Sequence, residues 1–591
     1  MKEIKKGSVL VIFGQNLPRK SKKWWQQFEK VIGPEILEEK IRNRGVDFIA
    51  IESLTSPGSI QEAHRLVSEL PHLTQADGRR ISKLVNWQGY ELWWMHFDDL
   101  MYQFCLPYTQ YRTLLLYLKD FNKIYLYQVI YSSLFQYFLN AHNRPYVIFG
   151  KFRLRNLLPL PFGVFVQLVL SLGFLLWLKI TKPRLMVWTS DKFDHPHDYD
   201  FRMKFVYEEL RKRKIHFVEF IRSLESWPVV LRHAWRRKRP VVYSAAIINI
   251  LHFLASHLGG NKNKELDDLS LSSAANPEEH FWFMVVTHYL HNIKGTVWSI
   301  RTMEFILRWT GVRVAYVSAG CNRTFHEVLG CKLLGIKTVG IQHAAIPKYA
   351  FIADFMPGFD GKLPLSVDGY GLWSNWWKEY YLSHSRAYRP EQLYVSGPAR
   401  PLEKNTVVTQ PIVLKNRPLK VLFVSEQLAD PSEVMPYLLK LLEIKDFILS
   451  LKARPYRDGF EEWLKANRPE ILKKVRVFRD TQQAISQSDV VVGSHSTVVL
   501  EALLQLKPLV FFWTNKWGDY FDIKSSGTKG RYFANNPEEL VDYIRKSSEI
   551  PKEVLKQLQE QFFGDPHQNG GKWVVEQAMK YLNEYKKDGT R

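Results

Sequence analysis

The chain has 591 residues, too many for one hydrophobic core, so two or three domains are expected. Hydrophobic residues make up 46% of the sequence and charged residues 24%, which excludes an intrinsically disordered chain. The net charge of +23 favours an anionic partner, whether nucleic acid, an anionic membrane surface or a phosphorylated substrate. The three cysteines form no CxxC pair, which argues against a structural zinc site and is typical of a reducing cytoplasm.

The N-terminal region, residues 1–183, is predicted to begin with a strand at 9–13, a helix at 24–44 and a strand at 46–51. The apolar run after the basic start is too short for a secretory signal. Residues 86–150 carry many aromatic side chains at helical spacing, which predicts a partly helical core. A surface that faces an acceptor or a lipid is the alternative.

Residues 162–178 form an apolar run with a single glutamine, Gln167. Its length lies at the short end of the roughly 17–25 residues that cross a bilayer. Lysine and arginine flank it on both sides, so the flanking charges give no orientation. We expect the segment to lie in or dip into a membrane interface with its flanking cations on anionic headgroups. A transmembrane span and a buried core helix are the alternatives.

A regular alternation of strands and helices begins near residue 184 and predicts a parallel sheet. The loop 191–200 is rich in Asp and His, but a polar loop is favoured over a metal site because the residues lack helical ligand spacing. The basic cluster 231–239 has no accompanying nucleic-acid motif, so it is interpreted as a phosphate-facing, membrane-facing or solvated surface.

Polar side chains follow the predicted strands of this first sheet. Open α/β sheets bind ligands at the carboxyl ends of their strands. Residues 312–345 read as strand, turn, helix and strand, and the side chains predicted to face a cleft from them are Asn322, Arg323, Gln342 and His343. A structural histidine in the core is the alternative for His343.

A second sheet is predicted after a polar linker near residues 403–418. Its strand ends again carry polar or charged side chains, which are Ser425, Glu426, Lys452 and Arg454. Residues 488–513 then read as strand, tight turn, helix and strand. In the turn, Gly493 allows a sharp bend, and the predicted capping side chains are Ser494, Ser496 and Thr497.

The first turn of this helix is a candidate anion site, because a helix N-terminus presents unpaired N–H groups and partial positive charge. Glu501 lies one helical turn after Thr497 on the same face, where its carboxylate can accept hydrogen bonds from ribose hydroxyls. An ordinary capped helix is the alternative.

The run 488–513 resembles the donor-nucleotide motif of GT-B glycosyltransferases, sugar-nucleotide 2-epimerases and CDP-glycerol-type glycerophosphotransferases. The resemblance implies that Ser496 and Thr497 hold a diphosphate and that Glu501 holds a ribose. It also implies a cleft-facing His343 as catalytic base, although Ala344 stands where relatives often have glycine. Arg454 stands where relatives carry histidine, and a guanidinium still suits a phosphate.

The expected fold is α/β, with two Rossmann-like domains (184–402, acceptor side, and 419–591, nucleotide-donor side) facing a cleft, and an aromatic, partly helical N-terminal extension. The expected activity is transfer of a sugar from a nucleotide-sugar donor to a cell-envelope polysaccharide or lipid-linked acceptor. The resemblance implies no cofactor and no metal, and the expected location is cytoplasmic, peripheral to the inner face of the membrane.

Three other functions stay open. One is transfer of glycerol or polyol phosphate from a CDP-activated donor, and another is 2-epimerisation of a nucleotide sugar. The third, from a different class, is nucleic-acid binding, which only the basic charge supports and which is not expected. Epimerisation requires neither the long N-terminal region nor a membrane segment.

Overall fold

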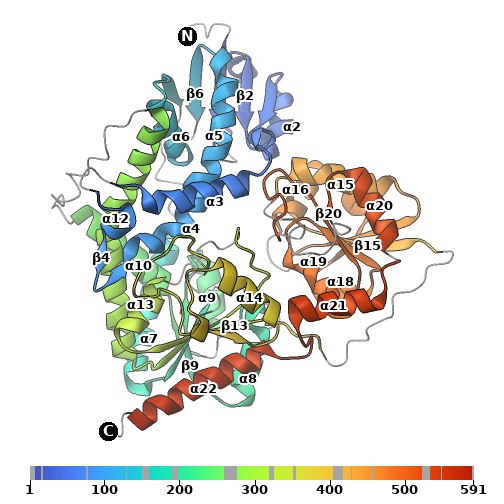
Figure 1. Cartoon of the computed structure of the whole chain (residues 1–591). Coiled ribbons are helices and arrows are strands. Elements are labelled where there is room, and N and C mark those ends of the chain that lie inside the picture. The colour runs from blue at the N-terminus through green and yellow to red at the C-terminus, as the bar shows by residue number, and fades with distance from the viewer. Residues whose placement is uncertain are drawn as a thin grey trace.

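The computed structural model describes residues 7–14, 17–74, 78–127, 129–149, 159–189, 198–237, 239–258, 276–317, 325–349, 354–403, 417–426, 429–454, 458–521, 533–547 and 549–588. Figure 1 shows three units, each built on its own parallel sheet, which we call the N-terminal unit, the middle domain and the C-terminal domain. The middle and C-terminal domains are the two expected Rossmann-like domains.

The N-terminal unit holds a five-stranded sheet of order β3-β2-β1-β6-β7. The strands are β1 (Ser8–Ile12), β2 (Lys30–Gly33), β3 (Asp47–Ala50), β6 (Lys123–Tyr127) and β7 (Tyr146–Phe149). The predicted first strand and the strand at 46–51 are confirmed, but the continuous helix predicted over 24–44 is wrong. Val31 and Ile32 form a short, fully buried strand between α1 (Lys22–Trp25) and α2 (Glu38–Arg42).

The aromatic region packs inward, as expected. Trp93, Trp94 and Phe97 have no exposed surface, and they lie in the core beside α3 (Ser59–Glu69) and α5 (Leu106–Tyr117). The remaining elements here are the antiparallel pair β4 (Asn86–Trp87) and β5 (Tyr90–Glu91), α4 (Phe97–Leu100) and α6 (Val129–Ala141). The N-terminal extension is therefore a third α/β unit.

The middle domain is a seven-stranded sheet of order β10-β9-β8-β11-β12-β13-β14, with every pair parallel. Its strands are β8 (Leu185–Thr189), β9 (Phe217–Ile221), β10 (Val241–Val242), β11 (Val314–Val317), β12 (Lys337–Ile341), β13 (Gly369–Leu372) and β14 (Leu393–Val395). The accompanying helices are α7 (Pro159–Thr181), α8 (Lys204–Lys212), α9 (Trp227–Arg236), α10 (Ser244–Leu258), α12 (Pro277–Thr310), α13 (Phe325–Leu333) and α14 (Asn375–His384).

The C-terminal domain is a six-stranded parallel sheet of order β17-β16-β15-β18-β19-β20. Its strands are β15 (Leu419–Val424), β16 (Phe447–Lys452), β17 (Arg476–Phe478), β18 (Val490–Gly493), β19 (Leu509–Phe512) and β20 (Phe533–Ala534). Its helices are α15 (Pro431–Glu443), α16 (Gly459–Asn467), α17 (Pro469–Lys474), α18 (Thr481–Ser486), α19 (Thr497–Glu501), α20 (Pro537–Ser547) and α21 (Lys552–Phe563).

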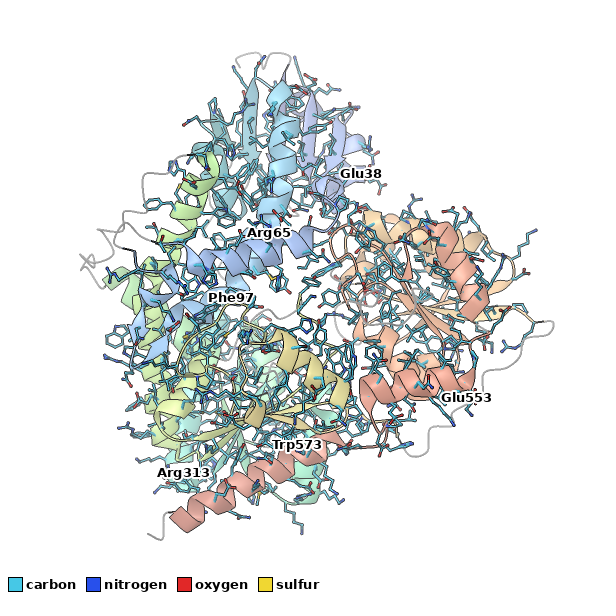
Figure 2. All side chains as sticks on the ribbon, in the orientation of Figure 1. Glu38, Arg65, Phe97, Arg313, Glu553 and Trp573 are labelled. Atoms are coloured by element: carbon cyan, nitrogen blue, oxygen red, sulfur yellow. The ribbon has the colours of Figure 1, made fainter. Side chains whose placement is uncertain are left out.

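The last helix, α22 (Gly570–Asp588), leaves the C-terminal domain and packs across the middle domain (Figure 1). Its buried side chains Val574, Val575 and Ala578 share a core with α8 and with strands β8 and β11. Trp573, labelled in Figure 2, lies at the first turn of this helix and its ring is 5.7 Å from that of Tyr394 on β14.

The N-terminal unit contacts both other units. On the C-terminal domain, the backbone N–H of Gly58 donates to Asn515 O at 2.9 Å, and Ser432 N donates to the Glu35 carboxylate at 2.9 Å. On the middle domain, Lys83 pairs with Asp360 at 2.5 Å. The extension therefore contacts both Rossmann-like domains.

Candidate functional site

The carboxyl edges of the two Rossmann-like sheets meet. Ala345, four residues after β12, donates its N–H to Thr497 Oγ1 across the domain boundary at 3.1 Å. Arg400, which follows β14, forms an ion pair with Glu501 of α19. Strand ends of two parallel sheets thus bring residues more than a hundred positions apart into one cleft.

The turn after β18 is built around a buried carboxyl group. Glu426, two residues after β15, accepts a hydrogen bond from Ser494 N at 2.5 Å. A Cβ at Gly493 would lie 2.5 Å from Glu426 Oε1 and 2.6 Å from Val499 Cγ2, so only glycine fits there. Ser496 caps α19 and accepts from Val498 N at 3.4 Å, as its predicted capping role requires.

Burial raises the pKa of Glu426 to about 8, while the backbone N–H groups of Ser494, His495 and Ser496 oppose the rise. These are N–H groups of the turn that the sequence predicts as the diphosphate site. The carboxyl group of Glu426 accepts hydrogen bonds from them. A diphosphate at this turn must therefore bind beside Glu426 or exchange places with it.

His495 belongs to the same turn and was not among the predicted residues. Its ring stacks on Trp517 with centroids 4.8 Å apart, and Nδ1 lies 2.7 Å from Ser494 Oγ and 3.3 Å from Glu426 Oε2. Burial lowers the pKa of His495 to about 3, so the ring is neutral at physiological pH. Its place inside a Gly-Ser-His-Ser turn was the signal that could have identified it.

Asp458, also missed, organises two predicted donor-side residues. Its carboxylate accepts hydrogen bonds from Ser425 Oγ at 2.6 Å and from Arg454 N at 2.6 Å. It also caps α16 through Glu461 N at 2.9 Å. Ser425 thus ties the end of β15 to this loop, while the Arg454 side chain stays exposed.

Lys452 ends β16 and is buried, with Nζ donating to Ala453 O at 2.6 Å. Burial lowers its pKa to about 8, with Glu501 raising the value and Arg400 lowering it. Lys452, Glu501 and Arg400 therefore form one electrostatic group across the domain boundary.

Glu501 itself is buried, and its predicted role as a ribose ligand requires Arg400 to move or to share the carboxylate. The side chain of Thr497 is likewise engaged, with Ala345. The structure therefore places the predicted donor residues Thr497, Glu501 and Lys452 at the domain boundary, each in contact with protein partners.

His343 lies two residues after β12 and is half-buried. Burial, and then the positive charges of Arg202, Arg222 and Arg400, lower its pKa to about 3, while Asp200 acts in the opposite direction. The neutral imidazole is therefore surrounded by cations of the middle domain. None of those arginines was predicted, because nothing local marks them.

The other predicted cleft residues differ in their placement. Gln342 is fully buried, and its Oε1 accepts from Trp373 N at 3.2 Å, so its side chain links β12 to the end of β13. Asn322, Arg323 and the loop 191–197 lie outside the described residues. Within the described part of the chain, no group of three or more His, Cys, Asp or Glu side chains is placed to hold a metal ion.

A cavity of about 1520 Å³ lies away from this cleft, at the amino edge of the middle sheet. It opens beside Leu185 and Phe217, the first residues of β8 and β9. The candidate donor site is therefore located by the charged side chains and strand ends that meet there. The cavity lies elsewhere and does not belong to that site.

No protein-family model and no curated protein matches the chain. Solved structures that match include the UDP-GlcNAc 2-epimerase from Neisseria meningitidis bound to UDP-GlcNAc (13% identity, 67% of this chain and 99% of that chain, TM-score 0.37). MurG from Acinetobacter baumannii (12%, 67% and 100%, TM-score 0.36) and the glycotransferase of kitacinnamycin (11%, 67% and 98%, TM-score 0.40) also match.

Glycosyltransferases and 2-epimerases, two of the classes that the sequence motif resembles, are thus among the matching structures. A similarity at these identities and TM-scores does not establish a shared activity. What the cleft does must be inferred from its own residues.

Proposed function

We propose that the protein is a glycosyltransferase that binds a nucleotide-sugar donor in the cleft between its middle and C-terminal domains. The observation that carries the proposal is the convergence of cations from both domains at the two carboxyl edges. Arg202, Arg222 and Arg400 act electrostatically on His343, Arg400 acts on Lys452, and Arg202 acts on Arg454.

Gathering like charges in a partly buried place costs free energy, unless an anion offsets their repulsion. The carboxylates near these cations, such as Asp200 and Glu501, offset part of it. A nucleoside diphosphate supplies compact negative charge for the rest. It also supplies ribose hydroxyls, which would donate hydrogen bonds to the carboxylate of Glu501.

The same cations suit the chemistry of sugar transfer. Negative charge develops on the departing diphosphate, and preorganised cations stabilise that charge in the transition state. Lys452 and Arg454 would act from the donor side and Arg400 from the middle domain. Because these residues can offset the charge, the proposed reaction requires no metal ion and no cofactor.

His343 is the proposed base that takes the proton of the acceptor hydroxyl. Its pKa is low because of burial and the positive charges of Arg202, Arg222 and Arg400. A bound diphosphate offsets those positive charges, so donor binding raises the pKa of His343 toward its ordinary value. The neutral imidazole would then become a stronger base in the loaded site, and Asp200 would stabilise the imidazolium that forms.

The acceptor is proposed to be a cell-envelope polysaccharide or a lipid-linked saccharide. The donor nucleotide separates this function from the alternatives, because a CDP donor would indicate polyol-phosphate transfer. Release of a free epimerised sugar nucleotide without any acceptor would indicate a 2-epimerase.

The test is a titration of the purified protein with UDP, GDP, CDP, CMP and ADP, followed by thermal unfolding. A ligand that binds only the native state raises the melting temperature by mass action. We expect one nucleotide to do so, and Glu501→Ala to remove the shift while its circular dichroism stays that of the wild type.

The matched control is Glu553→Ala, because Glu553 is exposed on α21 of the same domain (Figure 2). This variant should keep the full shift. An unchanged shift in Glu501→Ala would show that the donor site is assigned wrongly. No shift with any nucleotide, together with steeply salt-dependent binding to nucleic acid, would overturn the enzyme proposal in favour of nucleic-acid binding.

A further inference from the structure

Helix α7 exposes its apolar side chains. The segment from Phe162 to Thr181 has a mean hydropathy of 2.0. Even so, only 22% of this apolar stretch is buried inside the protein. The exposed side chains recur at intervals of three or four residues, which places them on one helical face. They are Phe162 (52% exposed), Phe165 (59%), Val169 (52%), Leu172 (61%), Leu176 (66%) and Ile180 (79%).

The face of α7 that packs on the protein carries two buried polar side chains among apolar ones such as Leu178. Gln167 and Ser171 have no exposed surface, and Gln167 Nε2 donates to Ser223 O at 3.0 Å. Ser171 Oγ accepts from Tyr243 N at 2.9 Å. A Cβ at Gly163 would collide with the Glu225 carbonyl oxygen. The helix is therefore anchored by a few polar contacts and still exposes a continuous apolar face, which a helix on a water-soluble surface does not do.

Two neighbouring helices extend this apolar surface. Trp227, Leu231 and Trp235 share one face of α9 and are 43%, 45% and 91% exposed. The Trp227 ring lies 6.0 Å from that of Phe162 on α7. On the other side, α12 packs along α7 and exposes Trp298 (50%) and Phe305 (64%). We call the exposed faces of α7, α9 and α12 the apolar platform.

The cavity at the amino edge opens at the C-terminal end of the platform. A second cavity of about 560 Å³ shares Trp177, Arg239 and Pro240 with it and runs along α7 past Val169 and Gly173. The cations that line the larger cavity are Lys182, Arg184, Arg211, Lys214, Arg236 and Arg239. Asp198 is the acidic residue among those lining it, so the cavity is strongly basic.

We propose that the apolar platform docks the protein on an anionic bilayer and that the basic cavity holds a phospholipid headgroup. The platform supplies aromatic and aliphatic side chains to the headgroup–acyl boundary, where tryptophan is favoured. The cavity supplies cations for the phosphate, and the groove past Val169 leads from it along α7 for an acyl chain. Charge and apolar surface together point to a lipid and not to a soluble anion.

A transmembrane position for α7 does not suit its packing. The elements against it include β10 and α9, and Arg237 at the end of α9 forms a buried ion pair with Glu219 at 3.1 Å. A span would carry these charged elements into the hydrocarbon layer, where charge is costly. A helix with one exposed apolar face lies in the plane of the interface instead.

The N-terminal end of α7 also lies near the carboxyl edge of the middle sheet, where the proposed donor site is. The first turn of α7 contacts Glu225, only a few residues beyond the carboxyl end of β9. Arg222, one of the cations near His343, follows that strand directly. A lipid-linked acceptor on the docked surface would therefore lie near the proposed reaction centre. The docking proposal rests on other residues than the donor site and goes beyond it.

The test is flotation of the full chain with vesicles of phosphatidylcholine alone and with phosphatidylglycerol added. The wild type should float only with the anionic vesicles. Leu176→Ser should weaken this binding roughly tenfold, because one buried leucine is lost from the lipid interface. The control Leu116→Ser removes a leucine of similar exposure (61%) from α5 in the N-terminal unit and should bind as the wild type.

The cavity is tested with Arg184→Glu combined with Arg236→Glu. Each cation near an anionic surface contributes roughly fivefold to partitioning, so the pair should cost at least about 25-fold. The control, Lys473→Glu with Lys474→Glu on exposed α17, changes the net charge equally and should float normally. Glycerol 3-phosphate should release the wild type more effectively than sodium chloride at equal ionic strength.

Four outcomes overturn the proposal. They are failure of the wild type to float, normal flotation of the platform variant, equal loss in both charge-reversal variants, and release that follows ionic strength alone. If Leu176→Ser instead dissociates a dimer in sedimentation without changing flotation, the platform is a contact between copies of this chain. A thermal shift with glycerol 3-phosphate without any vesicle binding would assign the cavity to a soluble phosphate.

The nucleotide titration separates this proposal from the proposed function. Both the platform and the cavity variants should keep the nucleotide-induced thermal shift, and Glu501→Ala should still float with anionic vesicles.

Discussion

The two edges of the middle sheet hold positive charge in different ways. At the carboxyl edge the cations are partly buried and meet carboxylates, as in the ion pair of Arg400 (25% exposed) with Glu501 (8% exposed). At the amino edge Arg184 and Arg236 are exposed beside the apolar platform. Buried charge needs a fixed partner, whereas exposed charge is solvated and can face a diffuse anionic surface.

This difference indicates that the excess of lysine and arginine in one chain can bind two kinds of anion, each at its own edge of the sheet. A compact diphosphate fits fixed, mutually balanced groups in a cleft, and a bilayer fits exposed cations around apolar side chains. A mutation at one edge should therefore impair nucleotide binding or vesicle binding, but not both. Each of the following changes separates them, beginning with the largest expected effect.

The first change is Glu426→Gln, which removes a carboxyl group whose pKa burial raises to about 8 from an ordinary 4.5. Because the folded pKa is the higher one, this carboxyl stabilises the fold below pH 4.5, and the contribution is lost as the pH rises to about 8. This group by itself contributes a loss of about 1.4 kcal/mol of stability per pH unit across that window, and the difference between the wild type and Glu426→Gln isolates it.

Urea unfolding measured across that pH range should show a flatter slope in Glu426→Gln than in the wild type. Glu553→Gln, at an exposed position of the same domain, should keep the wild-type slope. An equal slope in Glu426→Gln would mean that the carboxyl edge does not hold this group buried and protonated.

The second change compares one glycine from each region. Gly493→Ala would press its Cβ against Glu426 and Val499, and overpacking of this kind costs roughly 1–3 kcal/mol. A Cβ at Gly173 on α7 meets nothing within 4 Å, so Gly173→Ala should gain up to about 1 kcal/mol from helix propensity.

Chemical unfolding measures the change in unfolding free energy of each variant. Nucleotide titration and flotation then show whether each variant loses nucleotide binding or vesicle binding. Gly493→Ala should weaken nucleotide binding and spare vesicle binding, while Gly173→Ala should spare both. Loss of vesicle binding in Gly493→Ala at temperatures where it stays folded would contradict the independence of the two edges.

The third change concerns Lys452, whose pKa burial lowers to about 8. Its positive form is the one that attracts a diphosphate, so nucleotide affinity should fall as the pH rises through about 8. Lys452→Arg stays charged at this pH and should bind with a flat profile, if its longer side chain is accommodated.

Calorimetric titration between pH 7 and 9 should show roughly a tenfold fall for the wild type across this pH range. Vesicle binding should not change over the same range, because it rests on exposed cations elsewhere. The same fall in Lys452→Arg as in the wild type would assign the pH dependence to another group.

The sequence predicts much of the cleft because its residues occupy strand ends. Ser425, Glu426 and His343 follow short strands and Lys452 ends one, and the carboxyl ends of parallel strands share one edge. The partners of the predicted residues were missed. Arg400, for example, is 101 positions from Glu501 in the sequence, so no local pattern links the two. Asp458 and His495 were missed because each reads locally as an ordinary cap or turn residue.

The missed strand β2 has a local cause. Val31 and Ile32 are only two apolar residues inside a segment with helical spacing, and pairing with β1 and β3 decides their conformation. A strand this short gains its stability from its neighbours, so tertiary contacts override local propensity.

The sequence by itself determined the order of strands and helices in the two Rossmann-like domains and the length and apolar character of α7. These properties depend on residues near one another in the chain. Only the tertiary structure decided that Gln167 and Ser171 face the protein while Leu172 and Leu176 face outward. Periodicity shows that a helix has two faces, but packing against distant elements determines which face they cover.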